Sequence, residues 1–266
     1  MASTFQHDDS DKSKGSASRH DGGVRHLSEA TCNLVVKVVL FEGGSQLREV
    51  ECLFPSDGTF RPIENKPEWL LERLSNNQIA SNIDTLYMSE AIIYDSKISI
   101  PSGANVYIEE KRDKTNNSDH RRSVTGTKSM VALRVVATDA ETTMGVSTLE
   151  DEIFGTNGDP FNMRSQYLTC SFNQLDFVPA TTSGVTNGVY QVTPQGLTAL
   201  GTSHTTFQNT VINTANAQLG GTMSSLFDHV MQCLPSGVTY VGVPNWLAVG
   251  YVNSYLSLYN DNACGR

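Results

Sequence analysis

The chain has 266 residues, a formal net charge of −9 and 38% hydrophobic residues. This length allows one large domain or two small ones, and the apolar fraction is enough for a packed core. The acidic balance argues against nonspecific nucleic-acid binding, which needs clustered Lys and Arg to displace counterions from phosphates. No run reaches the roughly 18 to 20 apolar residues of a membrane-spanning helix. We therefore expect a globular chain with neither a nucleic-acid nor a membrane partner.

The first part of the chain reads as a polar leader followed by a β-rich module. Residues 1–30 contain scattered His and lack the apolar stretch and cleavage site of a signal peptide. We expect a disordered leader there, in which His7, His20 and His26 are solvated or hold a metal only weakly. Residues 31–112 are expected to form the module, with a hairpin over 33–41 and 48–54, a helix from Pro67 to Asn76, and strands over 91–94, 97–100 and 105–110.

A polar linker over residues 113–128 separates this module from a second one. It contains the glycosylation sequon at Asn116 and the basic pair Arg121-Arg122, which is either a processing site or part of a solvated loop. Residues 129–266 alternate helical and strand patterns, which predicts a mixed α/β module. The expected elements are strands over 130–138, 175–178, 189–193, 229–234, 246–252 and 255–259, a helix over 148–154 with Ser147 and Glu150 as a capping box, and a long helix over 203–219.

The five cysteines are an odd number and include no C-x-x-C pair. In an oxidising compartment we favour Cys32 with Cys52, across the predicted hairpin, and Cys170 with Cys233. Cys264 would then lack an intrachain partner. Alternatively, the cysteines are buried free thiols that pack as small apolar side chains.

Motif searches assign no catalytic or metal-ligating residue in this chain. It has no H-E-x-x-H zinc motif, no G-x-S-x-G elbow and no phosphate-binding glycine loop. His204 and His229 stand alone, which is more typical of structural histidines than of ligands. The carboxylates of residues 150–152, and Asp139 with Glu141, either bind calcium or favour the N-terminus of a helix.

Several short blocks in the second module occur in an order that is more specific than any single motif. They are Leu149–Gly155, Asp159-Pro160, Ser165–Tyr167, Cys170-Ser171, Phe177–Ala180, Phe227–Met231 and Tyr259–Asp261. Together they resemble the gametolysin-type (peptidase M11) zinc endopeptidases over about Met130 to Cys264. The resemblance implies an α+β fold, in which the β-rich module precedes the upper, sheet-plus-helix part of a metzincin-like catalytic domain.

The resemblance also implies zinc as cofactor, a protein or peptide substrate and an extracellular location. In that family the zinc helix, with H-E-x-x-H and a third His, follows the last sheet strands. None of those ligands can be placed on a residue of this chain, so no residue is assigned to zinc. The expected function is therefore the N-terminal portion of such an enzyme, inactive as this chain, and the alternative is a noncatalytic, peptidase-related binding protein.

In such enzymes the edge strand of the sheet binds the substrate backbone by strand addition. The resemblance places this role on residues 246–253, with Trp246, Gly250, Tyr251 and Asn253 as the substrate-binding residues; alternatively this is a core strand. It also suggests that residues 31–112 are a pro-segment. Cys52 would then either ligate the catalytic zinc and keep it latent, or serve in a disulfide or as a buried thiol.

Overall fold

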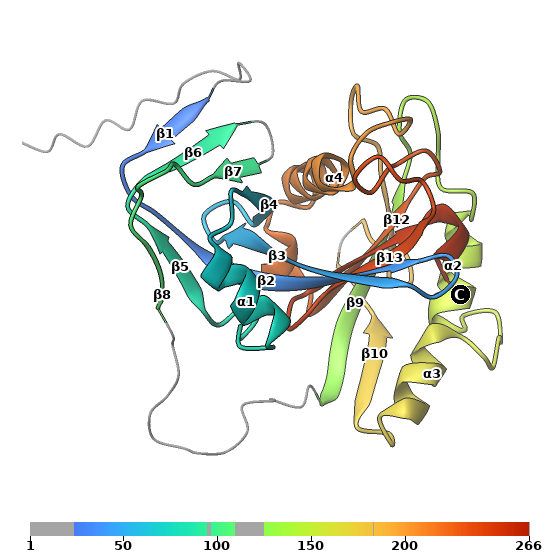
Figure 1. Ribbon diagram of the computed structural model, residues 1–266. Helices are drawn as coiled ribbons and strands as arrows, with labels where there is room; N and C mark the ends of the chain where they lie inside the picture. Colours follow the sequence, from blue (N-terminus) through green and yellow to red (C-terminus); the bar gives the residue numbers. More distant parts are fainter. Residues whose placement is uncertain (1–23, 95–96, 110–124, 183, 266) are drawn as a thin grey trace, which may run out of the picture.

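The computed structural model describes residues 24–94, 97–109, 125–182 and 184–265. These residues form a mixed 14-stranded sheet accompanied by helices on its faces, which confirms the predicted α+β class (Figure 1). The main path of the sheet runs β1-β6-β7-β4-β3-β2-β13-β14-β12-β9-β10. Strand β11 also pairs with β9, and β5 joins β2 to β8.

The N-terminal segment is β-rich, as its alternating apolar pattern predicts. Its hairpin of β2 and β3 and its single helix α1 lie where they are expected, while β4 and β5 are additional strands. Residues 25–27 form β1, which pairs with β6, so the prediction of disorder is wrong for this part of the leader. The elements are β1 (Arg25–Leu27), β2 (Ala30–Phe41), β3 (Gln46–Phe54), β4 (Thr59–Glu64), α1 (Glu68–Ser75), β5 (Thr85–Met88), β6 (Ala91–Tyr94), β7 (Lys97–Ser99) and β8 (Val106–Glu109).

The C-terminal segment is built around parallel strands. Strands β10 and β11 pair with successive parts of β9, β12 pairs with its other side, and β14 follows β12; all of these pairs are parallel. Strand β13 is antiparallel to β14. The elements are β9 (Gly126–Val135), α2 (Val146–Phe154), α3 (Met163–Cys170), β10 (Leu175–Pro179), β11 (Val189–Val192), α4 (His204–Leu219), α5 (Met223–Leu226), β12 (His229–Leu234), β13 (Trp246–Tyr251), β14 (Leu256–Asn260) and a 3-10 turn (Asp261–Ala263).

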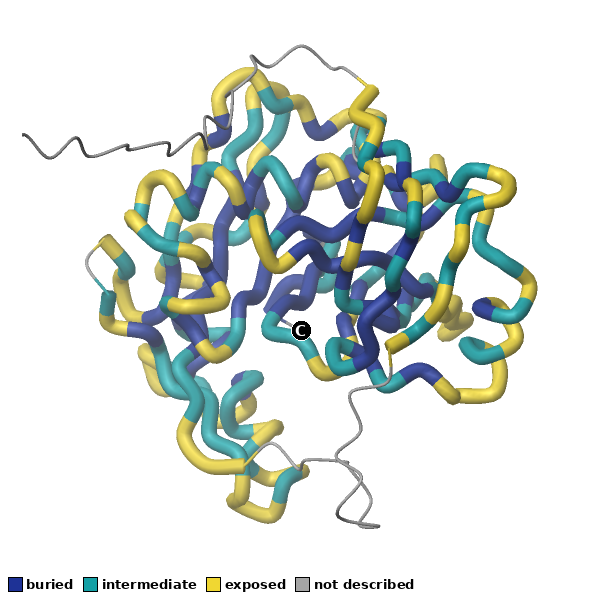
Figure 2. The backbone as a smooth tube through the Cα atoms, turned by 90° about the vertical axis from the view of Figure 1, so that its left-hand side faces the viewer, coloured by how far each residue is buried: buried dark blue, intermediate teal, exposed yellow. Residues whose placement is uncertain are grey.

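Helices cover the two faces of this parallel region separately. Val131, Leu133 and Val135 of β9 pack in one core cluster with Phe207 and Val211 of α4. The alternate residues of β9 pack on the other face, in a cluster with residues of α2. This two-faced burial explains why the buried parts of β9 and β12 are nearly continuous runs of apolar residues. Figure 1 shows α4 on one side of the sheet and α2 and α3 on the other, and Figure 2 shows the buried strands through the centre.

Helix ends follow local sequence signals in most places. Ser203 caps α4 by accepting a hydrogen bond from the amide of Thr206, and Gly220 ends the helix in the left-handed conformation. The capping box predicted at Ser147 is wrong, because α2 begins two residues earlier than expected and Gly145 is its N-cap. The sequence does not predict α3, whose residues have no apolar stripe and are not buried.

The two expected modules share one continuous sheet, because β2 of the first pairs with β13 of the second. Residues 126–128, assigned to the linker, belong to β9, where they pair with β10. His7, His20, the sequon at Asn116 and the pair Arg121-Arg122 lie outside the described residues. Within the described part of the chain, no helix is long and apolar enough to cross a membrane.

We expect Gly188→Ala to lower the free energy of unfolding by at least about 2 kcal/mol. Gly188 has a φ of +83°, and a Cβ added there would lie within 2.8 Å of the Phe154 ring and the Pro179 side chain. Gly196→Ala is the matched control: it has a φ of +69° but no atom within 4 Å of the added Cβ. The control should cost only about 1 kcal/mol. Equal costs in urea unfolding would contradict the packing argument.

Candidate functional site: the β2–β13 junction

Strand β13 is paired on both sides, so the prediction that it is a free edge is wrong. Its residues pair antiparallel with β14 through Ala248, Val249 and Gly250, and with β2 from Trp246 to Tyr251. Glu42 of the N-terminal segment also donates its amide to the carbonyl of Asn245 at 3.1 Å, and Val252 donates to Val36 at 2.8 Å. The hydrogen bonds that a peptide would make along this edge are therefore made by β2.

The residues assigned to substrate binding all lie at this junction, but two of them are in the core. Trp246 is fully buried, and its indole N–H donates to the carbonyl of Val238 at 3.0 Å. Tyr251 is also buried, and its ring lies 4.3 Å from that of Phe60 in β4. Gly250, next to the last residue of β13, is exposed. The burial of Trp246 and Tyr251 agrees with the alternative reading of a core strand.

Asn253, just after β13, contacts the N-terminal segment directly. Its side-chain amide donates to the carbonyl of Ser81 at 3.0 Å, and its own carbonyl accepts from the side chain of Asn82 at 3.1 Å. The hydroxyl of Ser81 in turn donates to the carbonyl of Val252 at 2.6 Å. These contacts attach the end of β13 to the loop before β5.

A buried ionic cluster lies under α4 at the same junction. The ammonium group of Lys37, on β2, is paired with Glu51 and lies 3.1 Å from Glu49, both on β3. Lys37 and Glu51 are each 1% exposed. Burial alone would raise the pKa of Glu49, but Lys37 and the hydroxyl of Tyr240 outweigh it and lower this pKa. The Glu49 carboxylate therefore stays charged beside the lysine.

Two tyrosines extend the cluster into the C-terminal segment. The hydroxyl of Tyr240 donates to Glu49, and that of Tyr251 lies 3.3 Å from Glu51 and 2.9 Å from the side-chain oxygen of Gln208 on α4. Burial and the neighbouring carboxylates raise the pKa of both tyrosines. They therefore act as neutral hydrogen-bond donors, and they couple β3 to β13 and α4.

His204, the first residue of α4, completes the cluster. Its Nε2 lies 3.4 Å from the Lys37 ammonium group and 3.1 Å from the hydroxyl of Thr205. Its ring stacks on Tyr240 with 4.3 Å between ring centroids. Burial, then the charge of Lys37, holds the pKa of His204 well below its usual value. The side chain is therefore neutral, and its Nε2 is the acceptor for the lysine.

His229 lies apart from this cluster, on β12. Its Nε2 is 2.9 Å from the hydroxyl of Ser257, and burial lowers its pKa to about 4. No three His, Cys, Asp or Glu side chains converge as possible metal ligands in the described ranges. The calcium alternative receives no geometric support either, since Glu141 pairs with Arg134 and Asp139 accepts the amides of residues 199 and 200.

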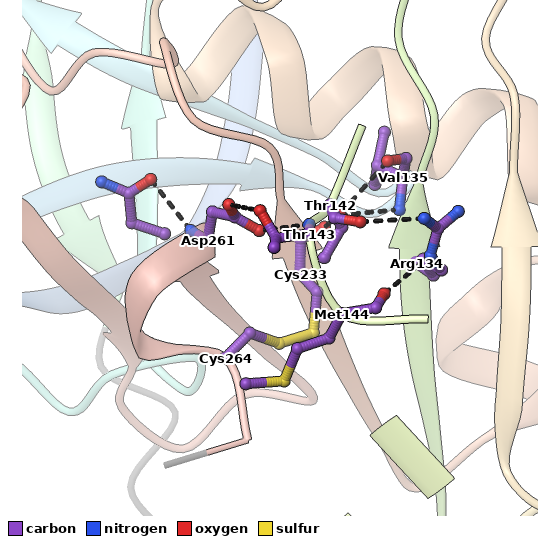
Figure 3. Close-up of a disulfide and its surroundings, with 9 residues drawn as sticks. Arg134, Val135, Thr142, Thr143, Met144, Cys233, Asp261 and Cys264 are labelled. Carbon is purple, nitrogen blue, oxygen red and sulfur yellow. Dashed lines mark hydrogen bonds between the residues drawn. A yellow bond between two sulfur atoms is a disulfide. The ribbon is translucent and has the colours of Figure 1, made fainter. Parts of the chain in front are cut away.

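One of the two favoured disulfides is correct. Cys32 and Cys52 are joined across the β2–β3 hairpin, which also means that the Cys52 thiolate cannot ligate a zinc ion. The pair Cys170–Cys233 is wrong: Cys233 is bonded to Cys264 near the C-terminus (Figure 3). Cys170 is exposed at the end of α3, whereas Cys233 is fully buried in β12.

We expect a thiol reagent to label the native chain at Cys170 alone. The other four cysteines are in disulfides, and all five lie in the described residues. Peptide mapping after alkylation without reductant should find the label at residue 170 and both disulfides intact. The observed pairing would be contradicted if the label were found at Cys264 or if Cys170 were not labelled.

The ionic cluster is the feature that sequence reasoning missed. A signal was present, because Lys37 interrupts an otherwise apolar strand, and Glu49 and Glu51 lie on one face of the next strand of a predicted hairpin. A cross-strand ion pair follows from that pattern. The partners from α4 and the loop before β13 are distant in sequence, so only the tertiary structure identifies them.

Comparison of this chain with known proteins identified no similar protein. No protein-family model matches the chain. No curated protein and no solved structure matches it either.

Proposed function

We propose that this chain is the N-terminal portion of a gametolysin-type zinc metalloendopeptidase, which hydrolyses extracellular matrix or cell-wall proteins. Residues 126–265 supply the upper part of its catalytic domain, and residues 24–109 are a pro-segment. Zinc would polarise the attacking water, but the sequence contains no H-E-x-x-H motif and no residue here is assigned as its ligand. We therefore expect the 266-residue chain to lack peptidase activity by itself.

The observation that carries this proposal is the position of β13. It is antiparallel in an otherwise parallel region, and it borders the C-terminal segment, because the strand beyond it belongs to the N-terminal segment. Without β2, β13 would present a free edge to which an extended peptide backbone can add. This is the role that the resemblance gives to residues 246–253.

The pro-segment part of the proposal follows from what covers that edge. Strand β2 makes the backbone contacts that a bound peptide would make, so a peptide cannot add to β13 while β2 is in place. The two disulfides are typical of a chain that folds in an oxidising compartment, which supports an extracellular location.

Sequencing the transcript past the Arg266 codon tests the proposed function. We expect an open reading frame with H-E-x-x-H soon after Cys264, and zinc-dependent hydrolysis of a protein substrate by the longer product. A stop codon directly after Arg266 would overturn the enzyme proposal. It would favour the second candidate, a noncatalytic peptidase-related binding protein, for which the shared sheet and buried cluster are then purely structural.

A further inference from the structure

His204 is placed where one proton changes the junction between the two segments. Its Nε2 is the acceptor that faces the Lys37 ammonium group at 3.4 Å. The side chain is 4% exposed, so water does not screen a charge placed there. Its other ring nitrogen, Nδ1, is also buried, and a hydrogen bond between the ring and the backbone of Thr239 partly offsets the lowering of the His204 pKa.

Protonation of Nε2 would convert an attractive contact into a repulsive one. The nitrogen would become a donor that faces another donor, and two positive charges would lie within hydrogen-bond distance. Histidine is the side chain whose ordinary pKa allows this change near pH 6. Lys37 is on β2 and His204 is on α4, so the repulsion acts between the segment that covers β13 and the segment that contains it.

We propose that the contact of His204 with Lys37 is an acid-sensitive latch: protonation of His204 releases β2 from β13 and exposes the edge of β13. This inference rests on the proposed function, in which that edge binds the substrate. The latch is closed at neutral pH, when the neutral imidazole accepts from Lys37. At mildly acidic pH the equilibrium shifts toward the open state, because the charged imidazole and Lys37 repel each other.

The carboxylates near Lys37 oppose this effect, whereas the tyrosine stacked on the His204 ring does not titrate in this range. Tyr240, stacked on the ring, has a raised pKa and stays neutral. Glu49 and Glu51 pair with Lys37, so their negative charges favour a protonated His204 and limit the repulsion by Lys37. Lys66 is a further cation near the two carboxylates. The lowered pKa of Glu49 means that its stabilisation is lost only at lower pH, as the pH falls through that value.

The size of the effect follows from proton linkage. The pKa of His204 is depressed in the closed state and returns to its ordinary value of 6.5 when the junction opens, so the closed state binds fewer protons. Stability is therefore present above that pH and is lost below it. Between pH 7.5 and 5.0 the equilibrium constant for opening should increase by up to about 30-fold. This is the factor expected when one histidine with an ordinary pKa binds a proton only in the open state.

Amide hydrogen exchange on the full chain tests the latch. The reporters are the amides of Val252 and Glu42, which bond across the junction, and the reference is the amide of Ala132, which bonds to Gly188 away from it. After correction for intrinsic exchange, protection of the reporters should fall by about 30-fold between pH 7.5 and 5.0. Protection of the reference should fall less. In His204→Gln, which has no charge at either pH, the reporters should show no such step.

His229→Gln is the matched control, because it replaces a half-buried histidine of the C-terminal segment that lies apart from Lys37 and should leave the step intact. A step that persists in His204→Gln, or no step in the wild-type chain, would overturn the latch. If His204→Gln does not fold, the ring of His204 can be titrated by NMR in the wild-type chain. Protonation without loss of reporter protection would then contradict the proposal. These results do not depend on zinc or peptidase activity, so failure of the latch is distinct from failure of the proposed function.

Discussion

Replacing Lys37 with Met is expected to lower the free energy of unfolding by about 3–5 kcal/mol, measured by urea unfolding at pH 7.5. Lys37 is buried with Glu51, and the substitution leaves this carboxylate in the core without its cation. Most of the lost stability comes from leaving the Glu51 charge buried without a partner, and little comes from the missing attraction between Lys37 and Glu51. Tyr251 lies close to the same carboxylate but supplies only a neutral hydroxyl.

Two further variants distinguish this account from a general effect of lysine removal. Lys128→Met breaks a partly exposed ion pair with Asp228 and should cost at most about 1 kcal/mol. The double variant Lys37→Met with Glu51→Leu removes both charges and should recover much of the stability. A cost near 1 kcal/mol for Lys37→Met alone would contradict the claim that the pair of Lys37 and Glu51 is buried.

Replacing Cys264 with Ser is expected to lower the free energy of unfolding by about 3 to 4 kcal/mol, which is the loop-closure term for a loop of this size. The disulfide joins residues separated by 31 positions and attaches the C-terminal turn to β12 (Figure 3). Asp261, next to this disulfide, accepts hydrogen bonds from the amide and hydroxyl of Thr143. Loss of the disulfide should therefore also loosen the loop that contains Thr143.

Cys170→Ser is the control for this variant, since Cys170 is free and exposed. Its stability should stay within about 0.5 kcal/mol of the wild-type value. Reductant should destabilise the wild-type chain by at least as much as Cys264→Ser, because it opens both disulfides. If Cys170→Ser costs as much as Cys264→Ser, the pairing of Cys233 with Cys264 is wrong.

The helices and strands with strong local signals could be predicted from the sequence. Helix α4 begins after Ser203 and ends at Gly220, as its cap, apolar spacing and terminal glycine predict. The hairpin of β2 and β3 and its Cys32–Cys52 disulfide are also confirmed. In each case the interacting residues are close in sequence, so the local pattern contains most of the information.

The errors concern contacts between residues that are distant in sequence. Cys233 pairs with Cys264 and not with Cys170, because β14 returns beside β12 and brings the C-terminal turn to it. Strand β13 is not an edge, because it pairs with β2, which is about 200 residues away in the sequence. Its own alternation of residues is compatible with an edge or a central strand, so no local signal distinguishes the two.

The burial of the ionic cluster also depends on the tertiary structure. The charge pattern of Lys37, Glu49 and Glu51 indicates a cross-strand contact, but it equally fits a solvated face of a hairpin. His204, at the start of α4, covers this contact from the C-terminal segment and stacks on Tyr240. An isolated histidine in the sequence thus becomes part of the junction between the two segments.

The pairing of β2 with β13 joins the two segments, and interstrand NOEs in a deuterated, amide-protonated chain can measure it directly. We expect NOEs between the amide regions of Val38 and Gly250 and of Val39 and Val249, which are partners in the register. We also expect the NOEs of β13 to β14 through Val249 and Leu258. NOEs from β13 to β14 alone, with none to β2, would show that the edge of β13 is free at neutral pH and would contradict the account.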